Sequence, residues 1–591
     1  MYKAPNTVKL TVYSTTVNDF KMMNIQYIKR VEFLEKLSQQ GSDSLDFVII
    51  VTGALETQDR QSLLTLLAEA VRVIKKRGLL FVQGVPGVLP ELGVFLEKQL
   101  VFKYWFAVES APVETQGLPT VHAAVMLFTK GDGGFTIQQV RLPHQYCKAC
   151  GRTLKDWGGK AHLMHPKGYA ISDVIKDLPP ADNYTQLSKP LFDVFIEMLN
   201  VAPSATEQTC KLVDVPSVQI NGCVGPLEGL PWLNSLVAER PAQYTLPHLP
   251  FPLRKDHVES PYIGGAPAID HHNLYNVIHH GDAIEVLKQY PDESIDLVFA
   301  DPPYNLDKDY TVYDDERADH KYIDWCNAWL SEYVRVLKPT GVLFVLNLPR
   351  WSLYHADFLN QHLYFQNWIV WDALSEPRGK IMPAHYALLF YTKHPSDFTF
   401  NYASVSPVDA RYYCLRASCI KHRKKAGDDD KSPLNDIWWD IHRIKHRRDR
   451  DYHPCQLPES LMERIIKLTT SPGDVVLDAF GGTGTTPIVA ARLGRRYVAI
   501  DLDINYVNMM REKIAQIESL GQVQRQSVKQ EARAITKKAL QLELRKLSVE
   551  LGRLPTPEDV KQKSQYNLEL FLETFPTWGK ALKAAKLEIQ V

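Results

Sequence analysis

The chain has no excess of charge of either sign. Lys plus Arg and Asp plus Glu each number 68 among 591 residues, so the formal net charge is zero. This balance excludes attraction of polyanions by a global positive field, and any affinity for DNA must come from local basic patches.

Regularly spaced cysteines and long apolar runs are also missing. The eight cysteines have no dense or periodic spacing, which excludes a disulfide framework and favours a reducing cytoplasm. No apolar run reaches the roughly 18 residues that a membrane span needs, and the first residues lack the apolar core of a signal peptide. We therefore expect a soluble, cytoplasmic protein of several domains without a membrane partner.

The most specific pattern present is a nucleotide-binding βαβ unit. An apolar strand pattern at 474–480 leads into the turn Gly481–Thr486, a helical stretch follows at 487–493, and a second strand at 496–500 ends at Asp501. Glycines allow close approach of a ligand to the backbone, and the terminal acid is placed to accept hydrogen bonds from ribose hydroxyls. The turn is not Gly-x-Gly-x-x-Gly, and no Lys-Ser/Thr of a phosphate-binding loop follows it. A ligand with a ribose but no pyrophosphate is therefore predicted.

A second motif, Asp301-Pro302-Pro303-Tyr304, directly follows the apolar run 295–300. The two prolines fix φ and lack backbone N–H donors, which leaves a rigid corner that offers only acceptors. A planar base with an exocyclic NH₂ group fits this corner, with acceptors for the amine hydrogens and a ring to stack on. Taken alone, the motif is equally compatible with a proline-rich turn that ends a strand.

Together, the two motifs resemble the S-adenosylmethionine-dependent amino-methyltransferases of DNA, the N6-adenine and N4-cytosine family. The target motif precedes the cofactor motif, as in the β group of that family, and the resemblance covers roughly residues 270–515. It implies an α/β, Rossmann-like methyltransferase sheet. It assigns catalysis to Asp301, Pro302, Pro303 and Tyr304, and binding of S-adenosyl-L-methionine to Asp282, Asp478, Phe480, Gly481, Gly482, Thr483, Gly484, Thr485 and Asp501.

The reaction that this resemblance implies is direct, site-specific methyl transfer to DNA, as in restriction-modification systems. The target base flips out of the duplex, Tyr304 stacks on it, and Asp301 with the Pro302 carbonyl accepts the amine hydrogens. Asp at the head of the motif favours adenine N6, since cytosine-N4 enzymes more often carry Ser there, and cytosine N4 stays the alternative. A non-catalytic DNA-binding protein of the same fold is a further alternative.

The first 200 residues repeat part of the pattern. Residues 71–82 match 334–345, and the offset of 263 continues without a gap to Lys130, which falls on Lys393. Similarity at one fixed offset over this distance indicates duplication.

The first copy has lost the residues that carry the chemistry. Val51-Thr52-Gly53-Ala54 stands opposite the Asp301 motif, and 211–214, the counterpart of the cofactor strand, has no glycine turn after it. The first copy either supports the second structurally or is a DNA-binding platform, which would make the chain a pseudo-dimer; a homodimer is the other arrangement. We predict a degenerate methyltransferase-like domain at 1–240, a proline-rich linker at 241–268, the catalytic domain at 269–517 and a helical module at 518–591.

A polar stretch at roughly 395–452 lies where the β-group order places a target-recognition region. It holds two basic clusters with two tryptophans between them. Clustered Arg and Lys serve phosphate contacts and guanine-edge readout, although a charge run elsewhere is usually a solvated face. The predicted contacts to double-stranded DNA, which would place the protein at the nucleoid, are Lys421, Arg423, Lys424, Lys425, Arg443, Lys445, Arg447 and Arg448.

Two further segments carry recognisable patterns. Cys147 and Cys150, with His162 and His165 after them, approximate a zinc site, although the second half is tighter than a zinc-finger spacing, and Cys414 and Cys419 of the second copy do not preserve this spacing. Leu-Gly-x-x-Pro-Thr at 551–556, followed by Phe-Pro-Thr-Trp, resembles the helical repeat appended to homing endonucleases. That repeat would add a DNA-contacting module, and a helical cap is the alternative.

Overall fold

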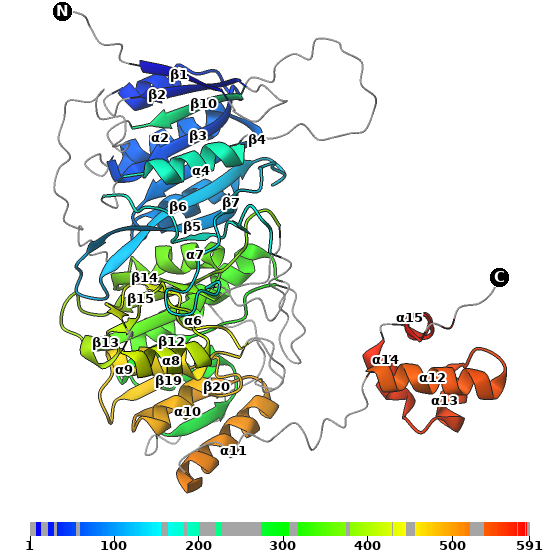
Figure 1. Cartoon of the computed structure of the whole chain (residues 1–591). Helices are drawn as coiled ribbons and strands as arrows, with labels where there is room; N and C mark the ends of the chain where they lie inside the picture. Colours follow the sequence, from blue (N-terminus) through cyan, green and yellow to red (C-terminus); the bar gives the residue numbers. More distant parts are fainter. Residues whose placement is uncertain are drawn as a thin grey trace, which may run out of the picture. The chain divides into compact units, whose positions relative to one another are not determined.

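Two eight-stranded mixed sheets form the first unit of the chain, Met1–Gln522, and a helical unit follows at Val523–Val591 (Figure 1). The structure is a computed structural model. It describes residues 7–13, 22–28, 32–54, 60–154, 164–182, 186–199, 220–226, 274–306, 317–373, 379–427, 430–444, 456–520, 537–575, 577–585 and 587. The linker predicted at 241–268 lies outside these residues.

The second sheet has the strand order β11-β20-β19-β12-β13-β15-β14-β18, in which β15 runs antiparallel to both of its neighbours, β13 and β14, and β14 is parallel to β18. Helices follow most of its parallel strands, which is the pattern of a Rossmann-like sheet. Its elements are β11 (Val277–His280), α5 (Ala283–Leu287), β12 (Ile295–Ala300), α6 (Asp319–Val336), β13 (Leu337–Asn347), α7 (Pro349–Leu359), β14 (Tyr364–Asp372), β15 (His385–Thr392), β18 (Ile437–Trp438), α9 (Glu459–Thr469), β19 (Val475–Asp478), α10 (Thr485–Arg492), β20 (Arg496–Asp501) and α11 (Ile504–Leu520).

The first sheet has the order β1-β2-β10-β3-β4-β6-β5-β9. Its elements are β1 (Thr7–Tyr13), β2 (Met22–Ile28), α1 (Phe33–Ser38), β3 (Leu45–Val51), α2 (Arg60–Val73), β4 (Ile74–Gly84), α3 (Leu89–Glu97), β5 (Leu100–Val113), β6 (Thr120–Lys130), β9 (Val174–Ile175), α4 (Lys189–Leu199) and β10 (Ile220–Gly225). Short pieces complete the unit: η2 (Thr52–Ala54), β7 (Arg141–Leu142), β8 (Tyr169–Ala170), η6 (Tyr402–Ser404), β16 (Val408–Asp409), α8 (Ala417–Ala426) and β17 (Lys431–Ser432).

Six neighbouring strands have the same order and direction in both sheets. The run β10-β3-β4-β6-β5-β9 corresponds to β19-β12-β13-β15-β14-β18. The register also shifts at corresponding places, between Phe102 and Tyr104 in β5 and between Phe365 and Asn367 in β14. The strand beside β3 is thus β10, at 220–225; the counterpart predicted at 211–214 lies outside the described residues.

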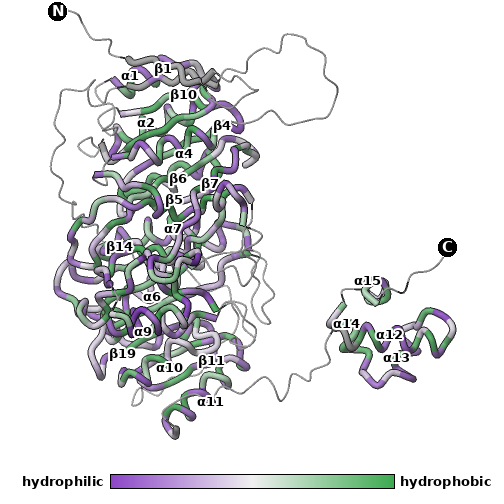
Figure 2. Tube along the Cα trace, viewed as in Figure 1, coloured by the Kyte–Doolittle hydropathy of each residue, from purple (hydrophilic) through white to green (hydrophobic). Residues whose placement is uncertain are grey.

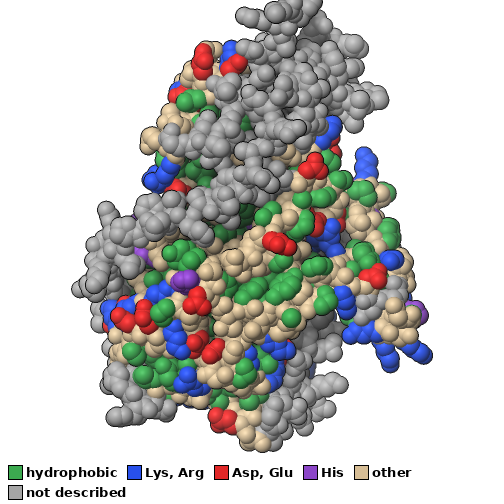
Figure 3. Space-filling model, turned by 90° about the vertical axis from the view of Figure 1, so that its left-hand side faces the viewer, with side chains coloured by type: hydrophobic (Ala, Val, Ile, Leu, Met, Phe, Trp, Pro, Cys, Tyr) green, Lys and Arg blue, Asp and Glu red, His purple; other side chains and the backbone are tan. Residues whose placement is uncertain are grey.

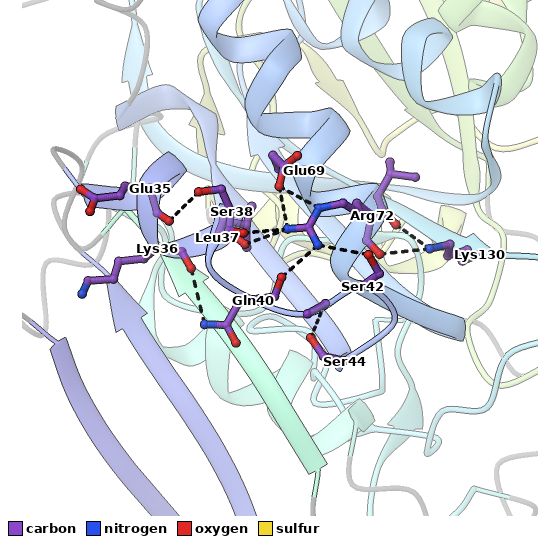
Figure 4. Close-up of polar contacts among 12 residues, drawn as sticks. Glu35, Lys36, Leu37, Ser38, Gln40, Ser42, Ser44, Glu69, Arg72 and Lys130 are labelled. Carbon is purple, nitrogen blue, oxygen red and sulfur yellow. Dashed lines mark hydrogen bonds and ion pairs between the residues drawn. The ribbon is translucent and has the colours of Figure 1, made fainter.

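A hydrogen-bond network around one arginine also recurs in both halves of the unit. The guanidinium of Arg72 binds Glu69 and the carbonyl oxygens of Leu37, Ser38 and Gln40 (Figure 4). Arg335 lies 263 positions later and makes the matching contacts with Glu332 and with the carbonyl oxygens of Leu287 and Tyr290. In both halves of the unit, an Arg–Glu pair on one helix thus holds the loop that follows the preceding short helix.

The two sheets meet at an interface in which equivalent residues of the two halves contact each other. Trp105 of β5 stacks on Trp368 of β14, with ring centroids 3.9 Å apart and planes 5° from parallel. Each indole Nε1 donates to its own strand partner, Trp105 to His122 Nε2 and Trp368 to His385 Nε2, both at 3.1 Å. Trp368 lies 263 positions after Trp105, and His385 lies 263 positions after His122.

Reciprocal backbone contacts surround the stacked indoles. Asp173 Oδ1 accepts the Ala384 N–H at 2.7 Å, and Asp436 Oδ1 accepts the Val121 N–H at 2.9 Å. Contacts of residue i with j and of j with i are the signature of a two-fold, isologous interface. Here, both sides of that interface belong to one chain.

Hydropathy follows the expected pattern, with apolar residues concentrated on the strands and polar residues on the outer helix faces (Figure 2). Strands β3 and β12 are almost completely buried, as central parallel strands should be. Among the described residues, no helix is long and apolar enough to cross a membrane.

The C-terminal unit contains four helices among its described residues: α12 (Lys537–Leu551), α13 (Pro557–Lys563), α14 (Leu568–Thr574) and α15 (Trp578–Ala584). Its apolar core includes Leu544, Leu547, Phe571 and Phe575. Thr556 caps α13 in a reciprocal capping box with Asp559. The helical expectation is correct, but α11 continues to Leu520, so the first unit extends beyond the boundary predicted at 517.

Candidate active site

The two predicted motifs lie next to each other, at the carboxyl ends of two adjacent strands of the second sheet. β12 and β19 are hydrogen-bonded parallel neighbours, and Phe299 of β12 is in register with Asp478 of β19. Asp301 lies two residues after Phe299, so it stands just past the level of Asp478. This is the carboxyl end of both strands, where open α/β sheets bind their ligands.

The Asp-Pro-Pro-Tyr corner is held by an aromatic shell. Tyr304 is buried, and its Oη donates to Asp301 Oδ1 at 2.6 Å. Trp351 Nε1 donates to the Tyr304 carbonyl oxygen at 2.8 Å, and Tyr322 Oη donates to the Pro303 carbonyl oxygen at 2.6 Å. The corner is thus rigid, and the carboxylate of Asp301 is oriented by the phenol that follows it.

Tyr333 links the target corner to the cofactor turn. Its Oη donates to the Phe299 carbonyl oxygen at 3.2 Å and accepts the Ala479 N–H at 3.0 Å. One buried phenol therefore fixes the spacing of the two strands at their functional ends. No sequence pattern pointed to this role, because Tyr333 is one of several aromatic residues on the apolar face of α6.

The glycine turn brings backbone next to the terminal acid of β20. Gly484, with φ +86°, begins α10, and the Gly482 N–H donates to Asp501 Oδ2 at 2.7 Å. Asp501 Oδ1 accepts the Asp503 N–H at 2.8 Å. Burial raises the pKa of the Asp501 carboxyl to about 7, although both N–H donors oppose the shift. A bound ribose could donate further hydrogen bonds to the remaining lone pairs.

Asp478 holds the glycine turn in shape through hydrogen bonds. The carboxyl is buried; its Oδ1 accepts the Phe480 N–H at 2.9 Å and its Oδ2 accepts the Thr486 hydroxyl at 2.5 Å. Burial raises its pKa to about 6 against these hydrogen bonds. The structure thus gives Asp478 a role in shaping the loop.

The other predicted cofactor residues surround the same turn. Asp282 caps α5, where its Oδ1 accepts the Ile284 and Glu285 N–H groups. Phe480 is half-buried and packs edge-on against Trp329, with centroids 5.2 Å apart. Thr483 and Thr485 are buried within the turn, and the Gly481 backbone lies close to Met510.

A second tyrosine, which the sequence did not single out, faces the corner. Tyr386 of β15 lies 6.1 Å from Tyr304 between ring centroids and 5.4 Å from Trp371. Arg443 Nη1 donates to the Tyr386 Oη at 3.0 Å. Of the predicted DNA contacts, Arg443 is thus connected to the catalytic corner through one side chain.

The remaining basic residues separate into three groups. Lys421, Lys424 and Lys425 are exposed on α8. Arg423, on the same helix, is completely buried, pairs with Asp409 and lies over the ring of Tyr413, so its prediction as a DNA contact is wrong. Helical periodicity explains the error, since one position in a basic run must face the core. Lys445, Arg447 and Arg448 lie outside the described residues.

The charged groups on the surface show no large area of one sign in the view of Figure 3, where Lys and Arg side chains are interspersed with Asp and Glu. This distribution agrees with the zero net charge.

Cys147 and Cys150 of the predicted Cys-His set lie with other cysteines and not with His165. His165 is exposed, and its Nδ1 accepts the Lys167 N–H at 3.1 Å, while His162 lies outside the described residues. Cys147 and Cys150 instead lie beside two cysteines of the second half, Cys414 and Cys419. The sequence could not reveal this set, because its members are more than 260 positions apart.

Comparison with known proteins identifies the part of the chain that carries these motifs. The model of the DNA methylase family (N6_N4_Mtase) matches residues 295–512. The type II methyltransferase M.HpaI of Haemophilus parainfluenzae is 37% identical over 238 residues, which are 39% of this chain and 72% of that protein.

The chain belongs to the DNA methylase family. The α/β fold and the family predicted from the motifs are therefore confirmed. The homing endonuclease associated repeat matches residues 535–588, which confirms the resemblance of the C-terminal module.

Other relatives of the chain include the type II methyltransferase M.BamHI of Bacillus amyloliquefaciens, at 40% identity over 39% of this chain, and the chain spans about half, 54%, of that protein. The DNA adenine methyltransferase YhdJ of Escherichia coli is 34% identical over 40% of this chain and 82% of its own length. Among solved structures, a DNA modification methylase of Thermus thermophilus in complex with S-adenosyl-L-methionine has 25% identity and a TM-score of 0.29, covering 40% of this chain and 93% of its own.

Proposed function

We propose that this DNA methylase transfers a methyl group from S-adenosyl-L-methionine to the exocyclic amine of a base in double-stranded DNA, with adenine N6 as the favoured target. The observation that carries the proposal is the register of β12 and β19, which brings the Asp301 corner next to the glycine turn. Cytosine N4 is the alternative target. The protein would act in the cytoplasm, where it meets the nucleoid.

The residues around the turn fit the proposed cofactor. Gly482 and Gly484 have positive φ, so the backbone can approach a ligand without Cβ atoms in the way. Asp501 offers a carboxylate to the ribose and the half-buried ring of Phe480 offers an apolar contact. When bound, the cofactor supplies an electrophilic methyl group on a sulfonium, and the electron pair of the broken S–C bond stays on sulfur.

The corner residues would orient the amine for this transfer. The carboxylate of Asp301 accepts an N–H of the target amine, which directs the nitrogen lone pair toward the methyl group, and after the N–C bond forms the amine releases one proton to solvent. The Tyr304 hydroxyl, which donates to Asp301 Oδ1, keeps the carboxylate in place. Holding two reacting atoms in line can contribute several kcal/mol to rate acceleration.

Adenine is favoured by the Asp at the head of the motif and by one relative, since the name of the Escherichia coli protein specifies adenine. Both bases present the same NH₂ group to acceptors, so the corner alone accepts either. Tyr386, 6.1 Å from Tyr304 between ring centroids, and Trp371, 5.4 Å from Tyr386, form an aromatic wall beside the corner.

Residues 1–240 are proposed to be a degenerate copy that makes the chain a pseudo-dimer. Support comes from the shared strand order, the repeated Arg72 and Arg335 networks and the reciprocal tryptophan stack. Val51-Thr52-Gly53-Ala54 offers no carboxylate at the place of the Asp301 corner, so this copy would not methylate. It would either support the catalytic copy structurally or hold DNA beside it.

The test is incubation of unmethylated genomic DNA with protein and labelled S-adenosylmethionine, followed by mass spectrometry of the nucleosides. We expect label in N6-methyladenine. Label in N4-methylcytosine alone would show that cytosine, and not adenine, is the target base. Absence of label from DNA would refute methyl transfer.

Two variants make the test specific. Asp301→Ala should abolish labelling, whereas Asp324→Ala, which removes an exposed carboxylate from α6, should leave it unchanged. Equal labelling by wild type and Asp301→Ala would refute the assigned role of the corner.

A further inference from the structure

Four cysteine sulfurs, two from each half of the first unit, gather between the two halves. Cys147 and Cys150 come from the segment after β7, while Cys414 and Cys419 come from the segment that enters α8. All four Sγ atoms lie within 4.8 Å of one another. Cys147, Cys414 and Cys419 are buried, and Cys150 is exposed.

The sulfur separations match a metal site and not a disulfide. Cys147 Sγ lies 3.7 Å from Cys419 Sγ, and Cys150 Sγ lies 3.7 Å from Cys414 Sγ. A disulfide requires about 2.05 Å between sulfurs. Four thiolates at the usual Zn–S distance of about 2.3 Å form a tetrahedron with edges of roughly 3.8 Å.

The backbone around the cysteines is built for thiolates. The Cys414 N–H donates to Cys147 Sγ at 3.3 Å. Cys147-x-x-Cys150 is closed by Gly151, whose φ of +65° lets the chain turn back so that the Cys147 N–H donates to the Arg152 carbonyl oxygen. Cys419 lies in the first turn of α8, where the helix dipole favours negative charge.

Cations and hydrogen bonds join the two segments around this cluster. Arg416 Nη1 donates to the Thr153 carbonyl oxygen at 2.8 Å, and the Lys148 N–H donates to the Tyr412 carbonyl oxygen at 3.0 Å. The Lys148 ammonium pairs with Asp430 and lies over the ring of Tyr412. These contacts hold the two cysteine-bearing segments against each other.

We propose that Cys147, Cys150, Cys414 and Cys419 bind one structural zinc ion that fastens the first half of the chain to the proposed target-recognition region of the second. Four sulfur ligands in tetrahedral arrangement select zinc over hard cations. Because all four positions are filled by protein, the site is structural and leaves no open coordination position for catalysis. The ion would anchor the first turn of α8, and so fix the helix that exposes Lys421, Lys424 and Lys425.

The direct test is the metal content of the full-length protein after expression in zinc-supplemented medium and purification without chelator. We expect one zinc per chain by mass spectrometry of the elements, release of that zinc when a mercurial reagent titrates four thiols, and a tetrathiolate absorption spectrum after substitution by Co²⁺. Protein without stoichiometric metal, with iron in place of zinc, or with a Cys147–Cys419 disulfide in non-reducing peptide mapping would overturn the proposal.

Variants locate the ion. Cys150→Ser, at the exposed position, should reduce zinc binding at least tenfold, whereas Cys326→Ala, which removes a buried cysteine elsewhere, should keep one zinc per chain. Retention of full zinc by a Cys150→Ser/Cys414→Ser double variant would also refute the site. The affinity of S-adenosylmethionine should stay at the wild-type value in Cys150→Ser, so this result is independent of the proposed methyl transfer.

Discussion

At the scale of single residues, the site depends on hydrogen bonds that position carboxylates. Asp301 is oriented by the Tyr304 hydroxyl, and Asp501 is held by the N–H groups of Gly482 and Asp503. The residue types were evident from the sequence. Their partners were not, because a motif gives the order of residues along a strand and not the direction of each side chain.

Removal of the Tyr304 hydroxyl should slow methyl transfer without unfolding the site. We expect Tyr304→Phe to lower kcat by roughly tenfold, which corresponds to about 1.4 kcal/mol and to the loss of one hydrogen bond to a charged group. Tyr304→Ala should lose more, since stacking of a base on an aromatic ring is worth about 1–3 kcal/mol. Single-turnover methylation at saturating DNA measures both. Equal rates for Tyr304→Phe and wild type would show that the hydroxyl does not orient Asp301.

Cofactor affinity should increase with pH because of Asp501. Burial raises the pKa of this carboxyl to about 7, so its ionised fraction increases between pH 6 and pH 8. Ribose hydroxyls donate to the ionised form, and the Kd for S-adenosylmethionine should fall by roughly tenfold over this range. Isothermal titration calorimetry measures the effect, and Asp501→Asn should bind weakly with the pH dependence from this residue removed.

The same residue opposes folding when the cofactor is absent. Its folded pKa of about 7 lies above the ordinary value of 3.8, so ionisation costs stability as the pH rises through this window. At pH 8, Asp501→Asn should therefore unfold at the same or a higher denaturant concentration than wild type. Strong destabilisation by this substitution at pH 8 would contradict the assigned pKa shift.

At the scale of elements, the turn between β19 and α10 is the most constrained feature of the site. Gly481 and Gly484 approach Met510 of α11 so closely that a Cβ at either position would contact its side chain, at 2.9 Å and 2.6 Å. The glycines therefore serve the packing of α11 as well as the approach of a ligand. Sequence reasoning anticipated only the second role, because Met510 follows 26 residues later on a separate helix.

A matched pair of glycine substitutions separates the two costs. Gly484 and Gly473 have nearly the same φ, +86° and +89°, but only Gly484 has neighbours within 4 Å of a built Cβ. Gly473→Ala should cost about 1–2 kcal/mol, the price of a left-handed backbone, and Gly484→Ala should cost more and also weaken cofactor binding. Urea denaturation and calorimetry measure these effects. Equal destabilisation by the two substitutions would show that contact with Met510 is unimportant.

At the scale of the whole molecule, the first unit joins two similar sheets through reciprocal contacts. The stacked pair Trp105 and Trp368 lies at the centre of this interface, and Asp173 and Asp436 bind backbone across it in both directions. Because both sheets belong to one chain, they meet at a high effective concentration, and their interface does not need the strength of one between separate chains.

The tryptophan stack should couple the stabilities of the two halves. Trp105→Ala and Trp368→Ala should each destabilise the chain by about 3–5 kcal/mol. The double variant should cost less than the sum, with a coupling of roughly 0.5–1.5 kcal/mol for the aromatic pair. Denaturation followed by tyrosine fluorescence provides the cycle. Additive costs would mean that the two rings contribute to separate cores.

The sequence determined the strands, the glycine turn, the Asp-Pro-Pro-Tyr corner, the family and the C-terminal repeat, because these depend on short-range periodicity and on motifs of fewer than about ten residues. It also revealed the repeat at an offset of 263. Only the tertiary structure decided that Arg423 is buried and that Tyr333 and Tyr386 support the site. It also decided that Cys147 and Cys150 lie beside Cys414 and Cys419, because contacts across more than 260 residues are set by how two sheets pack and leave no local pattern.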